Sequence, residues 1–139
     1  MALVEETRHD RGFSRWHAGF KQAAGTVLVA MSVYPSMVGG EGRFCTELMR
    51  VTKGRIIGKL GADGIYCAAE RDGGWALAAK IEDGNATVAP AAVIQALKQF
   101  SLLSDEEYQA LHGFAKWDIL NCCGEKVGET KAAFHMELA

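Results

Sequence analysis

Three apolar runs joined by two short polar turns constrain the fold of this chain more than any other feature. The runs are RIIGKLG at 55–61, GIYCAAER at 64–71 and GWALAAKIED at 74–83. The segments ADG and RDGG that join them carry the Asp-Gly and Gly-Gly pairs typical of β-hairpins. We therefore predict an antiparallel three-strand meander with helices packed against it.

The residues before the meander have helical spacing. Apolar residues recur every three or four positions from 14 to 31, which predicts a helix with one buried face and Ser14 as its N-cap. Pro35 and the glycines of YPSMVGGEG (34–42) are expected to break this helix. A shorter helix is predicted in RFCTELMRVT (43–52), ending at Lys53 and Gly54. The residues assigned to the buried faces are Phe20, Ala23, Ala24, Val27, Leu28 and Met31 in the first helix, and Phe44, Leu48 and Val51 in the second.

Two more helices and a pair of strands are predicted after the meander. APAAVIQALKQFSLL (89–103) has helical spacing, with Pro90 near the first turn, where proline is tolerated. SDEEYQALHGFA (104–115) begins with Ser104 as a cap, followed by acidic residues that suit a helix start. In the tail at 117–138, Gly124 lies at a turn between two predicted strands.

Size and composition fit one domain. The chain has 139 residues, of which 49% are hydrophobic and 23% charged, and it contains no internal repeat or linker. We predict a single α+β domain over 1–139, in which an antiparallel sheet, formed by the meander and the C-terminal strands, packs with helices.

Charge and hydropathy exclude some functions. A net charge of −2 gives no electrostatic reason to expect binding to nucleic acid or to an anionic membrane. The longest apolar run, 23–34, is shorter than the roughly 20 residues that cross a bilayer, and the N-terminal segment lacks the apolar core of a signal peptide. We expect a cytoplasmic protein with reduced cysteines, whose partner is a small molecule or another protein.

The glycine-rich stretch and the cysteines indicate structural roles more than a phosphate-binding loop or a zinc site. VGGEGR at 38–43 lacks the lysine and the Ser/Thr of a phosphate loop and is explained as a turn. The cysteines do not have the spacing of a self-contained zinc site. Cys45 is expected either in the core, which is the usual place of a free cysteine, or facing a site. The carboxylates at 41, 63, 82 and 83 fall at predicted turns.

Lys59 has two interpretations. It lies in the first strand of the meander among Ile56, Ile57 and Leu60, where burial would favour a neutral amine able to accept a proton. Lys-x-Gly on a strand also resembles the Lys-Thr-Gly strand that faces a Ser-x-x-Lys helix in the serine penicillin-recognising enzymes. Lys59 is either an active-site amine or an ordinary surface charge.

Four longer stretches carry a more specific resemblance. They are YPSMVGGEGRFCTELM (34–49), GKLGADGIYCAA (58–69), ALAAKIEDGN (76–85) and ILNCCGEKVGE (119–129). In this order they resemble the second half of the bacterial type II L-asparaginase family, of the Rhizobium type, over about 24–129. That family has a His-Pro-x-Met-Val-x-Gly turn, an Arg-Phe-Asp/Cys-Thr stretch, a Lys-x-Gly-Ala-Glu-Gly-Val strand and turn, and a closing Asn-x-x-Gly-x-x-Val-Gly-Glu.

The resemblance implies a β-lactamase-like or penicillin-binding-protein-like α+β fold and hydrolysis of L-asparagine to L-aspartate and ammonia. By the same resemblance, Lys59 matches the active-site lysine, and Cys45 matches a cysteine near a zinc site with cysteine and lysine ligands. The residues that match the substrate-binding stretches are Arg43, Thr46, Gly61, Asp63 and Gly64.

The departures from the family pattern decide what the chain can do alone. Tyr34 replaces the histidine before Pro35, and Asp63 replaces a glutamate. No serine or threonine is followed by lysine three residues later, so the Ser-x-x-Lys nucleophile is missing from this sequence.

Two hypotheses stay open. In the first, the chain hydrolyses asparagine only with an N-terminal half that supplies the serine, the lysine and the zinc ligands. In the second, it is a non-catalytic binding or assembly module that kept the fold. The second hypothesis predicts an exposed apolar face covered by self-association, so the expected partner is a complementary N-terminal chain or a second copy.

Overall fold

The computed structural model describes residues 2–6, 18–72 and 74–136. The helices are α1 (Ala18–Val33), α2 (Pro35–Gly39), α3 (Phe44–Val51), α4 (Ala89–Gln99), α5 (Asp105–Ala110) and α6 (His112–Ala115). The strands are β1 (Ala2–Glu6), β2 (Ile56–Leu60), β3 (Ile65–Glu70), β4 (Ala76–Ile81), β5 (Lys116–Leu120) and β6 (Lys126–Lys131). The α+β fold class predicted from the sequence is confirmed.

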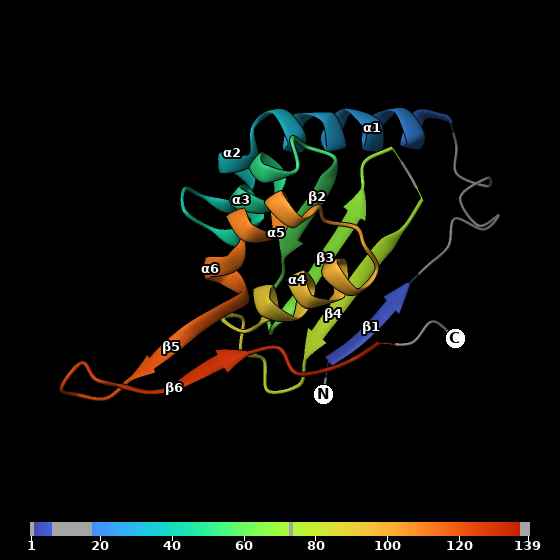
Figure 1. The fold of residues 1–139 in the computed structure, drawn as a ribbon. Helices are drawn as coiled ribbons and strands as arrows, with labels where there is room; N and C mark the ends of the chain where they lie inside the picture. Colours follow the sequence, from blue (N-terminus) through green and yellow to red (C-terminus); the bar gives the residue numbers. More distant parts are fainter. Residues whose placement is uncertain (1, 7–17, 73, 137–139) are drawn as a thin grey trace.

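The central sheet is antiparallel and has the order β1-β4-β3-β2 (Figure 1). Its β2-β3-β4 part is the predicted meander, with Lys59 opposite Cys67 and Tyr66 opposite Ala79. Two features differ from the prediction. β1 adds a strand at the β4 edge, and β5 and β6 form a separate two-stranded sheet instead of joining the central one.

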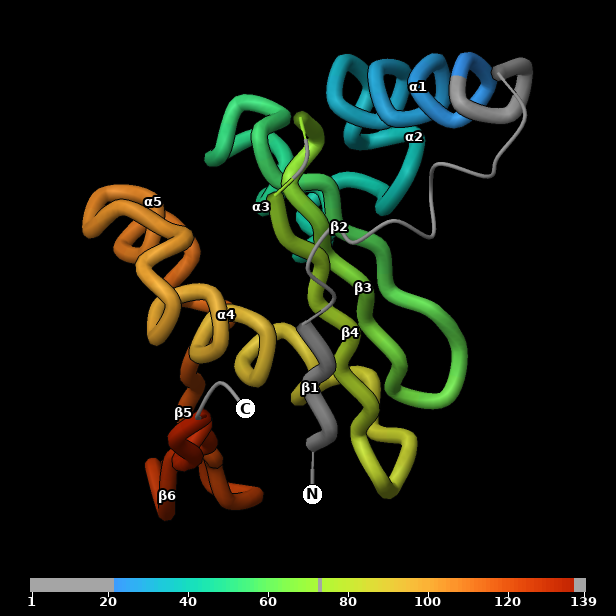
Figure 2. The backbone as a smooth tube through the Cα atoms, turned by 90° about the vertical axis from the view of Figure 1, so that its right-hand side faces the viewer, coloured from blue at the N-terminus to red at the C-terminus, as the bar shows by residue number. Residues whose placement is uncertain are grey.

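The core lies on one face of the sheet, under α3 and α4. Side chains alternate along strands, so Tyr66 and Ala68 of β3 point to the same face and are both buried. α4 covers that face with a nearly continuous apolar surface that includes Val93, Ile94 and Leu97. Figure 2 shows α4 and α1 on opposite faces of the sheet. The candidate site therefore lies on the α4 side.

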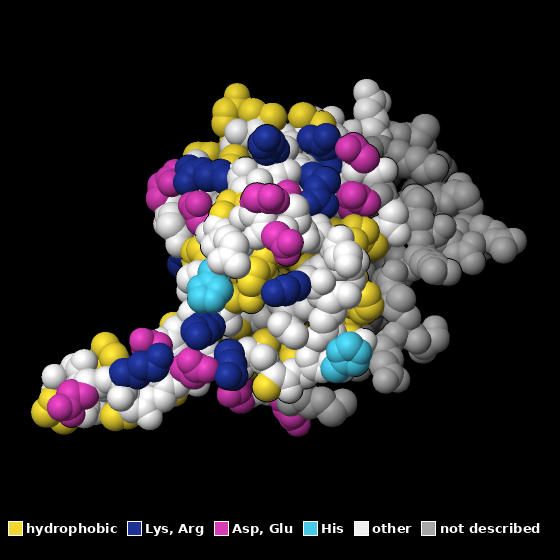
Figure 3. Space-filling model, in the orientation of Figure 1, with side chains coloured by type: hydrophobic (Ala, Val, Ile, Leu, Met, Phe, Trp, Pro, Cys, Tyr) yellow, Lys and Arg dark blue, Asp and Glu magenta, His cyan; other side chains and the backbone are white. Residues whose placement is uncertain are grey.

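α1 does not have the buried face that its sequence predicts. Val27 is 56% exposed, and only Leu28 and Met31 among the described predicted residues pack against the core. Ser14 and the Phe20 side chain lie outside the described part. The physical reason is that residues 22–40 carry no charge, so apolar residues surround the helix and its spacing does not define a single face. Hydrophobic side chains gather over α1 and α2 at the top of Figure 3.

Helix ends largely follow the predicted capping residues. Ser104 forms a capping box with Glu107, and Pro90 lies in the first turn of α4, as predicted. Pro35 does not simply break the chain, because it starts the short helix α2, where its missing N–H is not needed. None of the helices in the described ranges is long and apolar enough to cross a membrane.

Candidate active site

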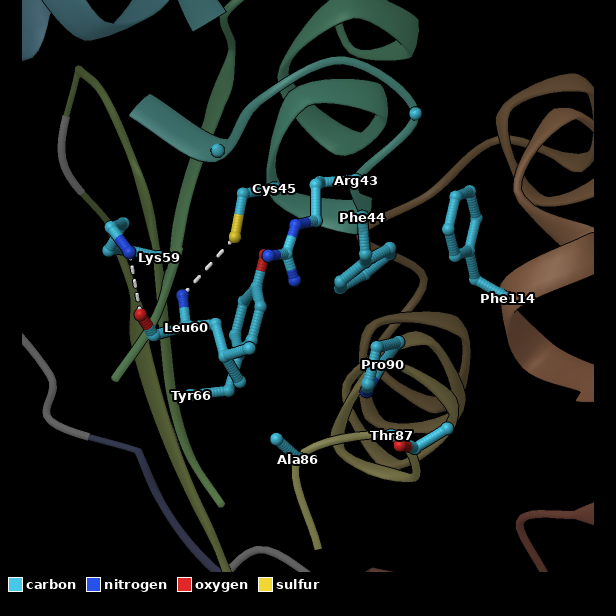
Figure 4. Close-up of a pocket in the computed structure, with 12 residues that line it drawn as sticks. Arg43, Phe44, Cys45, Lys59, Leu60, Tyr66, Ala86, Thr87, Pro90 and Phe114 are labelled. Carbon is cyan, nitrogen blue, oxygen red and sulfur yellow. Dashed lines mark hydrogen bonds between the residues drawn. The ribbon is translucent and has the colours of Figure 1, made fainter. Parts of the chain in front are cut away.

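A pocket of about 400 Å³ lies between the N-terminus of α3, the edge strand β2, Tyr66 of β3, the start of α4 and Phe114 of α6 (Figure 4). Gly39 and Gly42 of the glycine-rich turn form part of its rim. A Cβ at Gly39 would lie 2.8 Å from Thr46 Oγ1, so only glycine lets α2 approach α3 this closely. The predicted turn therefore also shapes the pocket.

Cys45 lies in the first turn of α3, and its side chain is 4% exposed. Its Sγ accepts a hydrogen bond from the Leu60 N–H at 3.2 Å. The thiol thus joins α3 to the edge strand β2 and lines the pocket beside Lys59. Both interpretations of Cys45 apply at once, because it is packed in the core and faces the site.

Tyr66 forms the floor of the pocket and is fully buried. Its hydroxyl has no hydrogen-bond partner among the described residues. Burial raises the pKa of the Tyr66 phenol well above its ordinary value, and the neighbouring Cys45 adds to the rise. A buried hydroxyl without a partner costs about 1–3 kcal/mol, and this one lies beneath the surface of the pocket.

Gly58 provides the space for this hydroxyl. A Cβ at position 58 would lie 2.6 Å from Tyr66 Oη and 2.8 Å from Leu48 Cδ2. The glycine in the Gly-Lys pair of β2 is therefore required by the packing of Tyr66 beneath α3.

Arg43 occupies the N-cap position of α3, and its exposed side chain lines the pocket. Among the described residues, no carboxylate pairs with its guanidinium group. Figure 4 shows the side chain directed into the pocket. A free guanidinium beside a helix N-terminus favours an anionic group, such as a carboxylate, in the pocket.

The expectation that Lys59 is desolvated is wrong. Its side chain is exposed, and Nζ donates a hydrogen bond to the Leu60 carbonyl at 2.7 Å. Lys59 lies opposite Cys67, and both side chains point away from the face that carries Tyr66. Since β2 is an edge strand, water reaches this side. Lys59 is on the rim of the pocket, with its amine turned toward its own strand (Figure 4).

The other predicted substrate-binding residues do not line this pocket. Thr46 is buried, and its hydroxyl donates to the carbonyls of Pro35 at 3.1 Å and Gly40 at 2.6 Å. Gly61, Asp63 and Gly64 lie at the β2–β3 turn, where Asp63 pairs with Lys80 at 3.1 Å. The structure therefore brings Arg43, Cys45 and Lys59 together at the pocket. Thr46 and the residues of the β2–β3 turn instead stabilise neighbouring loops through their hydrogen bonds and ion pair.

Sequence reasoning missed the residues that form most of the pocket wall. Tyr66 could have been found from strand alternation, because it shares a face with Leu60 and Ala68. Thr87 and Phe114 could not, because Thr87 lies in the turn before α4 and Phe114 lies in α6, and both meet the site only through tertiary packing.

The described residues alone do not fit the implied zinc site. Among them, no three His, Cys, Asp or Glu side chains gather closely enough to hold a metal ion. A structural zinc ion takes four ligands, and Cys45 is the one thiol that lines this pocket. No chemical step is therefore assigned to a metal here.

Together, a helix-covered antiparallel sheet and a pocket lined by a guanidinium, a buried thiol and a buried phenol define an α+β protein with one candidate site among the described residues. The profile of one family, L-asparaginase II, matches residues 3–132. The chain belongs to the L-asparaginase II family, as its motifs predicted, and the match begins well before residue 24. No curated protein matches the chain.

Proposed function

We propose that this chain forms the amino-acid-binding part of an L-asparaginase, and that hydrolysis of L-asparagine to L-aspartate and ammonia requires a second polypeptide that supplies the nucleophile. The observation that carries this proposal is the Arg43 guanidinium, which pairs with no carboxylate of the described ranges and is directed into a pocket of about 400 Å³ in a member of the L-asparaginase II family.

The pocket has the chemistry to bind an amino-acid amide. Arg43 can hold the α-carboxylate with two parallel hydrogen bonds, which a lysine cannot reproduce. The apolar ring of Phe44 and the buried Tyr66 close the pocket behind Arg43, which suits a ligand with one charged end and a short carbon chain. The volume lies in the usual range for small-ligand sites.

The pocket lacks an activated nucleophile. Amide hydrolysis by covalent catalysis needs a hydroxyl or thiol with a base beside it, and no serine here has a lysine three residues later. The Cys45 thiol is buried and accepts the Leu60 N–H, and Lys59 Nζ is hydrogen-bonded to the Leu60 carbonyl and not to the thiol. The proposed N-terminal polypeptide provides this Ser-x-x-Lys element. Lys59 then acts as the catalytic lysine on the rim after its amine leaves the Leu60 carbonyl. Zinc belongs to this proposal only if the second polypeptide adds ligands beside Cys45.

Ammonia release tests the proposal. Three samples are compared with L-asparagine: this chain, an N-terminal fragment of a family member that contains Ser-x-x-Lys, and their mixture. Only the mixture is expected to release ammonia. Arg43→Ala should raise KM by about tenfold or more, as expected for losing a charged contact to the substrate. Arg71→Ala is the matched control, because Arg71 pairs with Asp72 away from the pocket.

Two outcomes would change the assignment. Ammonia release by this chain alone, abolished by a substitution within it, would show that the chain contains its own nucleophile. Asparagine binding without hydrolysis in the mixture would instead indicate the alternative function, a non-catalytic binding module.

We also propose that a second copy of the chain covers the α1–α2 patch, which consists of Val29, Val33, Tyr34 and Met37. These side chains are 55%, 58%, 63% and 86% exposed. The side chains of the patch lie within the charge-free stretch 22–40, so the patch itself brings no like charges together across a two-fold axis. A hollow lined by Val33, Pro35 and Met49, and also by Arg50 and Lys53, adjoins the patch and can receive the apolar Met37 side chain of the partner.

A further inference from the structure

The β5–β6 hairpin carries two adjacent thiols at its tip. Asn121 to Gly124 form a β-turn, in which the Gly124 N–H donates to the Asn121 carbonyl at 3.0 Å. Cys122 and Cys123 occupy the two central positions, and both are exposed. Figure 1 shows that the hairpin projects away from the rest of the molecule, so the thiols are far from the candidate active site.

Hydrogen bonds from Asn121 fix the turn. Its Oδ1 accepts from the N–H groups of Cys123 and Glu125, each at 2.9 Å. Its Nδ2 donates to Glu125 Oε2 at 2.8 Å. Gly124 has a φ of 80°, which glycine adopts without strain and which closes the turn. The Asn121 hydrogen bonds therefore place both cysteines at the central positions of one turn.

These thiols are poorly suited to a disulfide with each other. No peptide bond in the described residues is cis. Adjacent Cα atoms across a trans peptide are about 3.8 Å apart, whereas disulfides usually join Cα atoms roughly 4.4–6.8 Å apart. Closing the bridge would make a small strained ring. One large atom inserted between the two sulfurs relaxes that ring.

We propose that Cys122 and Cys123 form a dithiol site for trivalent arsenic compounds. The arsenic centre of these compounds is soft and has a high affinity for paired thiols. With an organic arsenic oxide, R–As=O, two S–H bonds break and two As–S bonds form. The two protons leave with the arsenic-bound oxygen as one water molecule, and nothing is oxidised or reduced. Soft thiolate ligands select soft ions, so hard cations do not compete.

The rest of the molecule makes the site selective. Among the described residues, Cys45 is buried and Cys67 is exposed without a second cysteine beside it in sequence. A single thiol binds arsenic through one bond, which a free monothiol displaces, whereas a chelate resists displacement. Leu120 and Val127, 58% and 63% exposed, flank the turn and offer apolar surface to an organic group on the arsenic.

Intact-mass spectrometry with phenylarsine oxide tests this site. The reduced full chain is treated with one equivalent and then with excess glutathione. We expect one retained adduct per chain, with the mass of the reagent less one water, which a small dithiol removes. In Cys122→Ser and in Cys123→Ser, the amount of adduct retained after glutathione should fall by about tenfold or more, because each variant can form only one As–S bond at the turn. Cys67→Ser is the matched control and should keep it.

Each other result would overturn the assignment. Retention in either single serine variant would show that the two thiols do not act together. Loss in Cys67→Ser would place the site elsewhere, and an adduct that joins two chains would show that arsenic bridges copies instead. A far-UV circular dichroism spectrum of each variant, unchanged from that of the parent, excludes misfolding as the cause of a loss.

Discussion

At the scale of single residues, Gly58 and Tyr66 depend on each other. We expect Gly58→Ala to destabilise the fold by about 1–3 kcal/mol, because the added methyl group overlaps Tyr66 Oη and Leu48 Cδ2. Gly25→Ala is the matched control. No atom lies within 4 Å of its added Cβ, and alanine favours the helix by about 0.5–1 kcal/mol. Urea unfolding measures the change in the free energy of unfolding for both variants. Equal changes in Gly58→Ala and Gly25→Ala would contradict this packing.

Tyr66 also predicts an alkaline loss of stability. Its folded pKa is raised, so the folded state keeps the phenolic proton above pH ~10, where the unfolded chain releases it. The contribution is complete below that pH, and stability then falls by about 1.4 kcal/mol per pH unit as pH rises toward the folded pKa. Tyr66→Phe should remove this slope, whereas Tyr34→Phe, at an exposed side chain, should leave it intact. Chemical unfolding between pH 9 and 11 measures the slopes. The same slope in Tyr66→Phe would refute the assignment.

The sequence predicts which residues lie at the site better than it predicts how buried those residues are. Motif matching selected Arg43 and Cys45, which the pocket does bring together. It could not foresee that Lys59 is exposed, because alternation places a strand residue on one of two faces but does not say which face is covered. Thr46 was selected for the same reason as Cys45, yet its hydroxyl is used by two backbone carbonyls.

At the scale of elements, the β5–β6 hairpin should be the least protected sheet. It is two-stranded and projects from the body, and isolated two-stranded hairpins are marginally stable in water. We expect its amides, such as that of Ile119, to exchange with solvent at least about 100-fold faster than that of Ala68 in β3. Hydrogen exchange followed by NMR measures the difference. Equal protection would show that a second copy or another segment covers the hairpin.

Elements with local signals were predicted well, and those set by tertiary contacts were not. The meander and the Ser104 capping box follow from turn and cap residues near in sequence. The pairing of β1 with β4 joins residues far apart in the chain, and no local pattern specifies it. The separation of β5–β6 from the main sheet has the same cause, because strand spacing predicts a strand but not its neighbour.

At the scale of the whole molecule, the α1–α2 patch predicts concentration-dependent self-association. Met37→Arg should make the chain monomeric, because it would place a cation in the partner's hollow, which Arg50 and Lys53 also line. Val127→Arg, at an exposed residue of the hairpin, is the matched control and should not change the mass. Analytical ultracentrifugation over a wide concentration range measures the association. A parent chain that stays monomeric throughout would disprove the self-contact.

The central claim is that Arg43 and Tyr66 line a pocket that binds an amino-acid amide, with Arg43 holding the α-carboxylate. NMR titration of the isolated chain tests it most directly, because it needs no catalysis and no second polypeptide. L-asparagine should shift the amide signals of Gly42 and Leu60, which line the pocket, and leave Cys122 at the hairpin tip unchanged. The same amide without its α-carboxylate, 3-aminopropanamide, should have little effect, as should L-asparagine on Arg43→Ala. Equal shifts with both compounds, or no shift at the pocket, would contradict the account.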